Sequence, residues 1–132
     1  MTGMLDHLSL GVADLARSRA FYDVVLAPLG YRRRYDLEDA SGYGTPEPHA
    51  LREQALPFWI GHEPQGVPLN GHVCFRAPGR AAVDAFHRTA LAAGGRDNGR
   101  PGLRPHYHAH YYAAFVIDPD GHRIEAVCHQ PE

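Results

Sequence analysis

Histidine stands out in this chain, because ten of its 132 residues are His. His7 and His72 each begin a short stretch in which apolar and polar residues alternate, the pattern of a half-buried strand. Glu125 lies inside a third such stretch, Ile124-Glu125-Ala126-Val127, where burying an unpaired carboxylate would be costly. Two imidazoles and one carboxylate on one face of a sheet would form ligands for divalent Fe, Mn, Ni or Zn and leave positions open for substrate oxygens.

The same residues also have an ordinary structural interpretation. A lone histidine in a strand is more often a half-buried side chain than a metal ligand. What favours a metal site here is the combination of His7 and His72 at equivalent places of a repeat with an acid inside an apolar strand.

The elements that must position these residues occur twice. A strand at 4–12 is followed by a helix that starts after Asp14, a good N-cap, and ends near Pro28 and Gly30. A strand at 71–77 is followed by a second helix that Gly94 and Gly95 close. A shift of 65 positions aligns the two units, placing His7 on His72, Phe21 on Phe86 and Gly30 on Gly95. The pattern indicates an internal duplication.

Each unit continues with short strands. We expect them at 30–36, 40–44 and 57–61 in the first unit, and at 96–99, 111–118 and 122–128 in the second. Asp118-Pro119-Asp120-Gly121 is typical of a β-turn joining the last two strands. Segments 45–56 and 99–110 are expected to be loops. The prediction is therefore an α+β protein with two βαβββ modules, about 4–61 and 71–129, in a single domain over 1–132.

Composition and charge argue against several function classes. The net charge is −2 and the densest basic stretch is Arg32-Arg33-Arg34, so nucleic acid is not an expected partner. No apolar run approaches the roughly 20 residues that span a bilayer, and the N-terminus does not resemble a signal peptide. Cys74 and Cys128 form no CxxC pair and are predicted to be free core thiols. The expected location is the cytoplasm, away from membranes.

Other residues near the three candidate ligands could contact a substrate. Ser9 and Arg76 are expected on the same sheet faces as the two histidines, and Trp59 is either a core aromatic or a wall for the substrate. Tyr107 and His108 are candidate proton donors, and Tyr111 and Tyr112 are candidate clamps. Two further groups of histidines are less informative. The alternating triplet is either a separate metal site or, more simply, a solvated loop, and the others are expected at the surface: His106, His108 and His110; His49, His62, His87 and His129.

Four segments of the chain resemble the vicinal oxygen chelate superfamily, which includes glyoxalase I, extradiol dioxygenases, fosfomycin-resistance proteins and bleomycin-binding proteins. They are 6–15, 18–22, 71–73 and 115–125, the last being the most specific. The resemblance implies two βαβββ modules that form a cupped mixed sheet with the helices on its outer side. It also implies metal ligands at His7, His72 and Glu125, a small-molecule substrate and a homodimer.

One departure from the family pattern concerns the first module. Glyoxalase I takes another Glu from that module's last strand, whereas the same offset places Glu125 opposite about Ile60, where no acid stands. The pattern is closer to the three-ligand members. The resemblance therefore implies a metal-dependent enzyme that binds substrate through vicinal oxygens, with lyase or isomerase proton transfer favoured over dioxygenase or transferase chemistry. The alternative is a metal-free drug-binding protein of the bleomycin-binding type.

Overall fold

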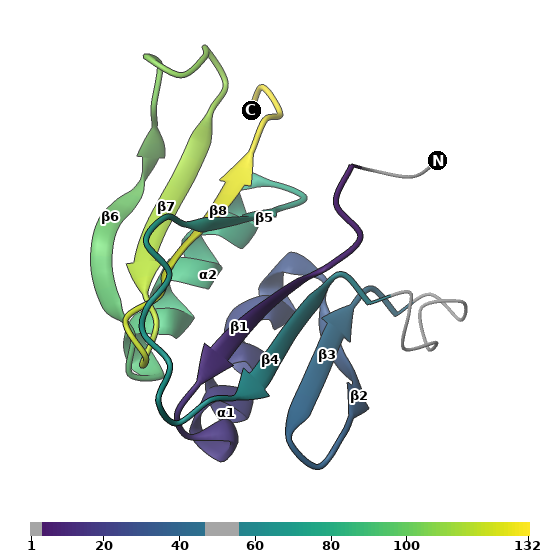
Figure 1. Cartoon of the computed structure of the whole chain (residues 1–132). Coiled ribbons are helices and arrows are strands. Elements are labelled where there is room, and N and C mark those ends of the chain that lie inside the picture. The colour runs from purple at the N-terminus through teal and green to yellow at the C-terminus, as the bar shows by residue number, and fades with distance from the viewer. Residues whose placement is uncertain (1–3, 47–55) are drawn as a thin grey trace.

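The strand–helix–strand–strand–strand order occurs twice in the structure, as the sequence predicts (Figure 1). The computed structural model describes residues 4–46 and 56–132. The first module comprises β1 (Leu8–Val12), α1 (Leu15–Leu26), η1 (Ala27–Leu29), β2 (Arg32–Asp36), β3 (Ala40–Gly44) and β4 (Phe58–His62). The second comprises β5 (Val73–Arg76), α2 (Arg80–Ala92), β6 (Arg96–Leu103), β7 (Tyr112–Ile117) and β8 (Arg123–Cys128).

Each module forms a four-stranded mixed sheet in which the first strand pairs with the last. The strand orders are β1-β4-β3-β2 and β5-β8-β7-β6, with β1 parallel to β4 and β5 parallel to β8. The other neighbours are antiparallel. Both helices lie behind the sheets in Figure 1, so the opposite face of each sheet is turned to the viewer. The α+β class and the two-module architecture are confirmed.

The first helix begins and ends where its residues predict. The Asp14 side chain accepts a hydrogen bond from the Arg17 N–H, which satisfies one of the free donors of the first turn. Pro28 lies in η1, and Gly30 follows with a φ of 93°, a left-handed conformation that glycine adopts without strain. The apolar side of the helix packs into a core shared by both modules, which includes Phe21, Tyr22, Val25, Leu26, Val83, Phe86, Val116 and Ile124.

The second helix departs from its predicted faces at two positions. His87, expected at the surface, is buried, and its Nε2 lies 2.8 Å from Asp97 Oδ1 on β6. An imidazole can occupy this partly apolar position because the carboxylate satisfies its ring nitrogen. The helical spacing of Val83, Phe86, Ala90 and Leu91 predicts one apolar face; the first three are buried, whereas Leu91 is 41% exposed.

The turn between β7 and β8, within the second module, binds the first module through hydrogen bonds. It closes with a hydrogen bond from the Gly121 N–H to the Asp118 carbonyl, as the β-turn prediction requires. Asp118 Oδ2 accepts a buried hydrogen bond from the Tyr22 hydroxyl of α1. Asp120 accepts hydrogen bonds from the Ala13 N–H and the Ser18 hydroxyl, at the start of the same helix.

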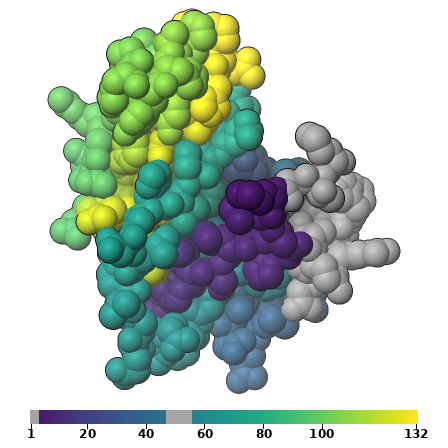
Figure 2. All heavy atoms as spheres, turned by 45° about the horizontal axis from the view of Figure 1, so that its top comes forward, coloured from purple at the N-terminus to yellow at the C-terminus, as the bar shows by residue number. Residues whose placement is uncertain are grey.

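His122, in the same turn, holds both the first strand and the segment between the modules. Its Nδ1 accepts from the Leu69 N–H at 3.0 Å, and its Nε2 lies 2.7 Å from the Gly11 carbonyl of β1. A carbonyl only accepts, so Nε2 is the donor and Nδ1 the acceptor in this arrangement. The teal segment that follows β4 runs across the surface between the modules (Figure 2).

The loop predicted over 99–110 is partly wrong, because β6 continues to Leu103 with register shifts at Asp97/Gly99 and Gly99/Gly102. Most of the loop predicted over 45–56, and His49 within it, lies outside the described residues. Neither described helix is long and apolar enough to cross a membrane.

Candidate functional site

The face of each sheet turned away from the helices carries several of the candidate site residues, and we call it the open face. In the second module, backbone register places Gly99, Phe115, Glu125 and Cys74 in one row across β6, β7, β8 and β5. Alternation puts the neighbours of these residues on the opposite face, where Ala114, Val116, Ile124 and Ala126 join the core. The row therefore gathers side chains from four strands on the open face.

Glu125 is the centre of this row. Its side chain is only 1% exposed, and its Oε1 lies 3.1 Å from His72 Nε2. The Tyr111 hydroxyl donates to Oε2 at 2.5 Å. His72 directly precedes β5 and Tyr111 directly precedes β7, so strand pairing brings both beside the acid on β8. Both carboxylate oxygens thus have partners, which explains how an acid is tolerated in an apolar strand.

The protonation states of the groups around Glu125 follow from their surroundings. Desolvation and the neighbouring Glu125 carboxylate raise the pKa of Tyr111, so at neutral pH its hydroxyl donates and the carboxylate accepts. Desolvation and Glu125 also raise the pKa of Cys74 to about 12. Cys74 therefore remains a thiol at neutral pH and is not activated as a nucleophile. It is also exposed, so the prediction that both cysteines are core thiols holds only for the buried Cys128.

The first module has a corresponding row without an acid. Ser9, Trp59, Gly42 and Tyr35 lie in register across β1, β4, β3 and β2. Trp59 pairs with Ser9 as Glu125 pairs with Cys74, so the predicted equivalence of Glu125 with Ile60 is wrong by one residue. Ile60 is fully buried in the core, whereas Trp59 is half-buried on the open face and packs edge-on against Tyr35.

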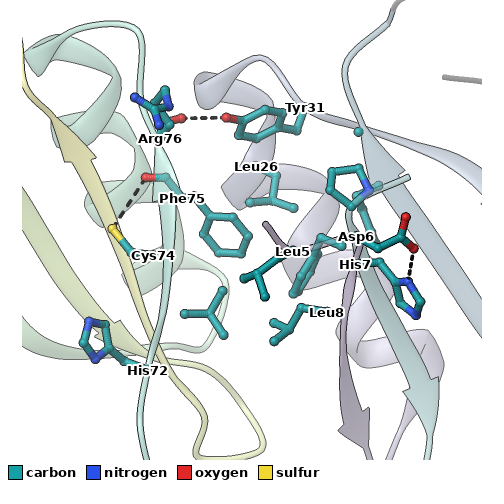
Figure 3. A pocket seen from close by; sticks show the side chains of 15 residues that line it. Leu5, Asp6, His7, Leu8, Leu26, Tyr31, His72, Cys74, Phe75 and Arg76 are labelled. Carbon is teal, nitrogen blue, oxygen red and sulfur yellow. Dashed lines mark hydrogen bonds and ion pairs between the residues drawn. The ribbon is translucent and has the colours of Figure 1, made fainter. Parts of the chain in front are cut away.

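A pocket of about 360 Å³ lies between the first strands of the two modules. Its floor is apolar and includes Leu26, Phe58 and Phe75, while His7 and His72 are both among its lining residues. Figure 3 shows these two histidines on opposite sides of the pocket. His7 is half exposed, and its Nδ1 lies 2.6 Å from Asp6 Oδ2. Arg76 also lines the pocket, where its carbonyl accepts from the Tyr31 hydroxyl at 2.8 Å.

His72 and Glu125 have donor atoms suited to a divalent cation. Two ligand atoms bonded at about 2.1 Å and at right angles to one another lie about 3.0 Å apart, close to the separation of this pair. The hydrogen bond from Tyr111 holds the carboxylate in place, as partners of metal ligands commonly do. Within residues 4–46 and 56–132, however, no three His, Cys, Asp or Glu side chains are grouped to hold an ion. The pair fits a metal, but His7 does not join it within one chain.

The predicted proton donors lie beside Tyr111 rather than beside Glu125. The Tyr107 ring is 4.9 Å from that of Tyr111, and Tyr107 is 58% exposed. His108 Nδ1 accepts from the His110 N–H, and its Nε2 lies 2.7 Å from His129 Nδ1. The His108 and His129 rings stack against each other and meet Tyr111 edge-on. Within the described residues, the predicted triplet of His106, His108 and His110 does not form a metal-binding group.

The remaining predicted substrate contacts are divided between the two faces. Ser9 and Trp59 lie on the open face of the first module, and Tyr111 reaches the open face of the second. Tyr112 lies on the other side of β7, where its hydroxyl donates to Asp84 of α2 at 2.6 Å and Arg80 covers its ring. That hydrogen bond raises the pKa of Tyr112 to about 12. The structure does not bring Tyr112 to the candidate site.

Sequence reasoning missed Phe115, which shares the row with Glu125 and whose ring lies 6.4 Å from that of His72. The signal was present, because Phe115 alternates with Ala114 and Val116 in a strand whose other face is buried. It also missed His122, which appears in the sequence only as a residue after a turn. No local sequence pattern predicts its hydrogen bonds to Leu69 and Gly11.

Comparisons with known proteins agree with this architecture. The family model described as the Glyoxalase/Bleomycin resistance protein/Dioxygenase superfamily matches residues 4–126. A search of the curated proteins found no match. A solved glyoxalase/bleomycin resistance protein from Albidiferax ferrireducens T118 shares 30% identity with a TM-score of 0.81, covering 96% of this chain and 99% of that chain.

Two more distant structures share the fold. The fosfomycin resistance protein FosX from Listeria monocytogenes has 18% identity and a TM-score of 0.67, with 98% of this chain and 96% of that chain covered. A bleomycin resistance determinant encoded on the transposon Tn5 has 19% identity and a TM-score of 0.60, with 93% and 95% covered. Resistance proteins of two kinds thus share this fold, so the fold alone does not determine the function of this chain.

Proposed function

The chain belongs to the glyoxalase/bleomycin resistance protein/dioxygenase superfamily, and on that premise we propose that it is a metal-dependent enzyme acting on a small molecule. The observation that carries the proposal is the buried Glu125 carboxylate, which His72 and Tyr111 hold from two neighbouring strands. The reaction class that we favour is proton transfer of the lyase or isomerase type. The two free cysteines are consistent with a reducing location, the cytoplasm.

In this proposal His72 and Glu125 hold one divalent ion, Fe, Mn, Ni or Zn. When bound, the ion would supply a Lewis acid that polarises two adjacent oxygens of the substrate. Tyr111 keeps Glu125 oriented and, with its raised pKa, stays protonated while doing so. Tyr107 and His108, which pack on Tyr111 at the exposed rim, are the groups we assign to moving a proton to or from the substrate.

His7 would act as the third ligand from a second copy of the chain. Within one chain it lies across the pocket from His72, on the other module (Figure 3). The homodimer that the family resemblance implies offers the other route by which an equivalent His7 reaches the His72–Glu125 pair. A closed two-fold dimer would then contain two equivalent sites, each built from both chains.

The primary test is metal analysis of tag-free protein, comparing wild type with His72→Ala and with His62→Ala as a matched control. His62 is exposed at the end of β4 and contacts neither Glu125 nor Tyr111. We expect wild type and His62→Ala to hold close to one ion per chain and His72→Ala to hold none. A wild-type protein that stays empty after incubation with each ion contradicts the enzyme proposal.

The shared site has its own test, in which His7→Ala and His72→Ala chains are unfolded together and refolded. If His7 acts from the second copy, each mixed dimer regains one intact site and metal binding returns to the mixture. If His7 acts within its own chain, the mixture stays as empty as the separate variants. The refolded single variants serve as the controls.

A metal-free binding protein is the second candidate, and the aromatic face of the first module favours it. Trp59 and Tyr35 pack edge-on in the row that lacks an acid, where they could stack on an aromatic drug. An empty wild type whose unfolding temperature rises with small aromatic compounds, with the rise lost in Trp59→Leu, would support this reading over the enzyme.

A further inference from the structure

Arg104 follows β6 and lies over the open face of the second module. Its guanidinium carbon is 5.3 Å from the centre of the Phe115 ring, in a cation–π arrangement. Its Nη1 donates to the Gly102 carbonyl and its Nη2 to the Arg100 carbonyl, both at 2.9 Å. The side chain is therefore folded back along its own strand and fixed above the face.

Two glycines make room for this position. A Cβ added to Gly99 would come within 2.9 Å of the Phe115 ring and 3.3 Å of Arg104 Nη2, and one added to Gly102 would come within 3.2 Å of Nη1. Gly99 also has a φ of 149°, which a residue with a side chain rarely adopts. The guanidinium can lie over the Phe115 ring because β6 carries no side chain at these points.

The charge of Arg104 is not neutralised by a carboxylate of the described residues, none of which forms an ion pair with it. A guanidinium has five N–H donors, and only two of them hydrogen-bond within residues 4–46 and 56–132. The side chain is half-buried, so the other donors remain accessible from solvent. A fixed, half-buried cation with free donors has the properties of an anion-binding group.

The position of Arg104 relative to Glu125 sets the length of a ligand. Gly99, beneath the guanidinium, lies on β6 and Glu125 on β8, with Phe115 of β7 between them in the same row. Two strand spacings separate β6 from β8, roughly 10 Å. In space, the order along the row is then the Arg104 cation, the Phe115 ring and the His72–Glu125 pair.

We propose that Arg104 binds an oxyanion of the substrate, a carboxylate or a phosphate-type group, at the end opposite its vicinal oxygens. This inference rests on the proposed function, because it takes the His72–Glu125 pair as the place where those oxygens bind. The substrate is then an elongated acid whose apolar or aromatic middle lies over Phe115, and Arg104 selects it against neutral analogues.

The test uses simple probes on the full chain after treatment with EDTA, so that it does not depend on metal. Phenylphosphonate and benzoate carry a ring and an oxyanion, and benzyl alcohol is the neutral control. The side-chain Nε–Hε NMR signal of Arg104, assigned from the Arg104→Gln variant, reports binding. We expect a saturable shift with the oxyanions and none with benzyl alcohol, and the tighter of the two anions identifies the type of acid.

Arg104→Gln should weaken binding of the preferred anion by about tenfold or more, since hydrogen bonds to a charged group are lost. Arg104→Lys keeps the charge but not the planar fork, and should give an intermediate loss. Arg100→Gln is the matched control, because Arg100 is exposed, adjacent, and contacts Arg104 through its backbone carbonyl. An unshifted Arg104 signal, or equal losses in the Arg104→Gln and Arg100→Gln variants, overturns the inference.

The two proposals fail separately. If the protein binds metal but the Arg104 signal does not respond to either anion, only the role of Arg104 is lost. If the anions bind at Arg104 while no metal binds at His72 and Glu125, the chain is a binding protein for organic acids and the metal-dependent reaction is excluded.

Discussion

The open faces of the two modules have the same backbone and different chemistry. Glu125 occupies on β8 the register position that Trp59 occupies on β4, and Cys74 stands opposite Glu125 as Ser9 stands opposite Trp59. Around Glu125 lie a histidine and a tyrosine hydroxyl, whereas around Trp59 lie an edge-on tyrosine ring and a bare glycine. Two modules of the same topology thus present a polar, charged face and an aromatic face.

The difference shows which positions of the repeated module vary between its two copies. Core positions of the two modules must keep packing against the shared helices, so Ile60 and Ile124 remain apolar and fully buried. Open-face positions carry no such requirement. The second module places an acid there and surrounds it with partners, and it is in this module that we propose metal binding and proton transfer. The first module contributes an apolar wall.

Replacing the central residue of each row should give the largest contrast. Glu125→Gln removes the charged side chain of the proposed ligand pair, and we expect metal affinity to fall by more than about 100-fold, beyond the 10–100-fold typical of losing a residue that only orients a ligand. Trp59→Phe, at the equivalent position, should leave metal affinity unchanged. Isothermal titration calorimetry with the preferred ion measures the metal affinity of both variants. Equal losses in the two variants would remove the distinction between the faces.

Substitutions of the tyrosines beside these two residues should differ in the same direction, with a smaller effect on metal affinity. Tyr111→Phe leaves one oxygen of buried Glu125 without its donor, so we expect a 10–100-fold loss of metal affinity and about 1–3 kcal/mol of stability. Tyr35→Phe should change stability by less than about 0.5 kcal/mol, because the Tyr35 hydroxyl makes no hydrogen bond within the described residues. Chemical denaturation and metal titration of the two variants would test this; a Tyr111→Phe protein that matches wild type contradicts the assigned role.

The smallest contrast concerns how each helix is tied to the edge strand of its sheet. Asp23 of α1 pairs with Arg33 of β2, a cation at every pH, while His87 of α2 pairs with Asp97 of β6. The hydrogen bond from His87, followed by that from the Gly99 N–H, lowers the pKa of Asp97. A depressed carboxyl pKa gives stability that is present above the unfolded value, near 3.8, and is lost as the pH falls through the folded value.

We therefore expect the urea midpoint of wild type to fall slightly more than that of Asp97→Asn between pH 5 and pH 3. The effect is modest because Asp97 is exposed to solvent. If the midpoints of the two proteins fall equally over this range, the His87–Asp97 pair does not contribute to stability.

The sequence predicted the two modules, and it predicted that His72 and Glu125 lie close together, because both predictions rest on local patterns; their role as metal ligands stays a prediction. Alternation fixed the faces of β5 and β8, and an acid in an apolar strand singled out Glu125. The equivalence with Ile60 failed because the offset between the modules changes from 65 at Ser9 and Cys74 to 66 at Trp59 and Glu125. A single shift cannot follow such a change, whereas strand register records it directly.

The residues that sequence reasoning missed depend on contacts between distant segments or on irregular backbone. Arg104 follows a strand whose register shifts twice, so no period of two marks the side on which its guanidinium lies. His87 is buried because Asp97 on β6 pairs with its ring nitrogen, a contact that helical periodicity alone does not predict. His122 is fixed by Gly11 and Leu69, more than fifty residues away in each case.

The pairing of the first strand with the last in each module has a consequence for the order of folding. β1 cannot complete its sheet until β4 has formed, and β5 must wait for β8. The turn before β8 also supplies the contacts to α1, so the first module gains its final partners late. Such long-range closure slows folding, since chain entropy is lost before the contacts are gained. On a ribosome, the strand carrying Glu125 emerges after every other strand described here, and the site would be the last part of the molecule to assemble.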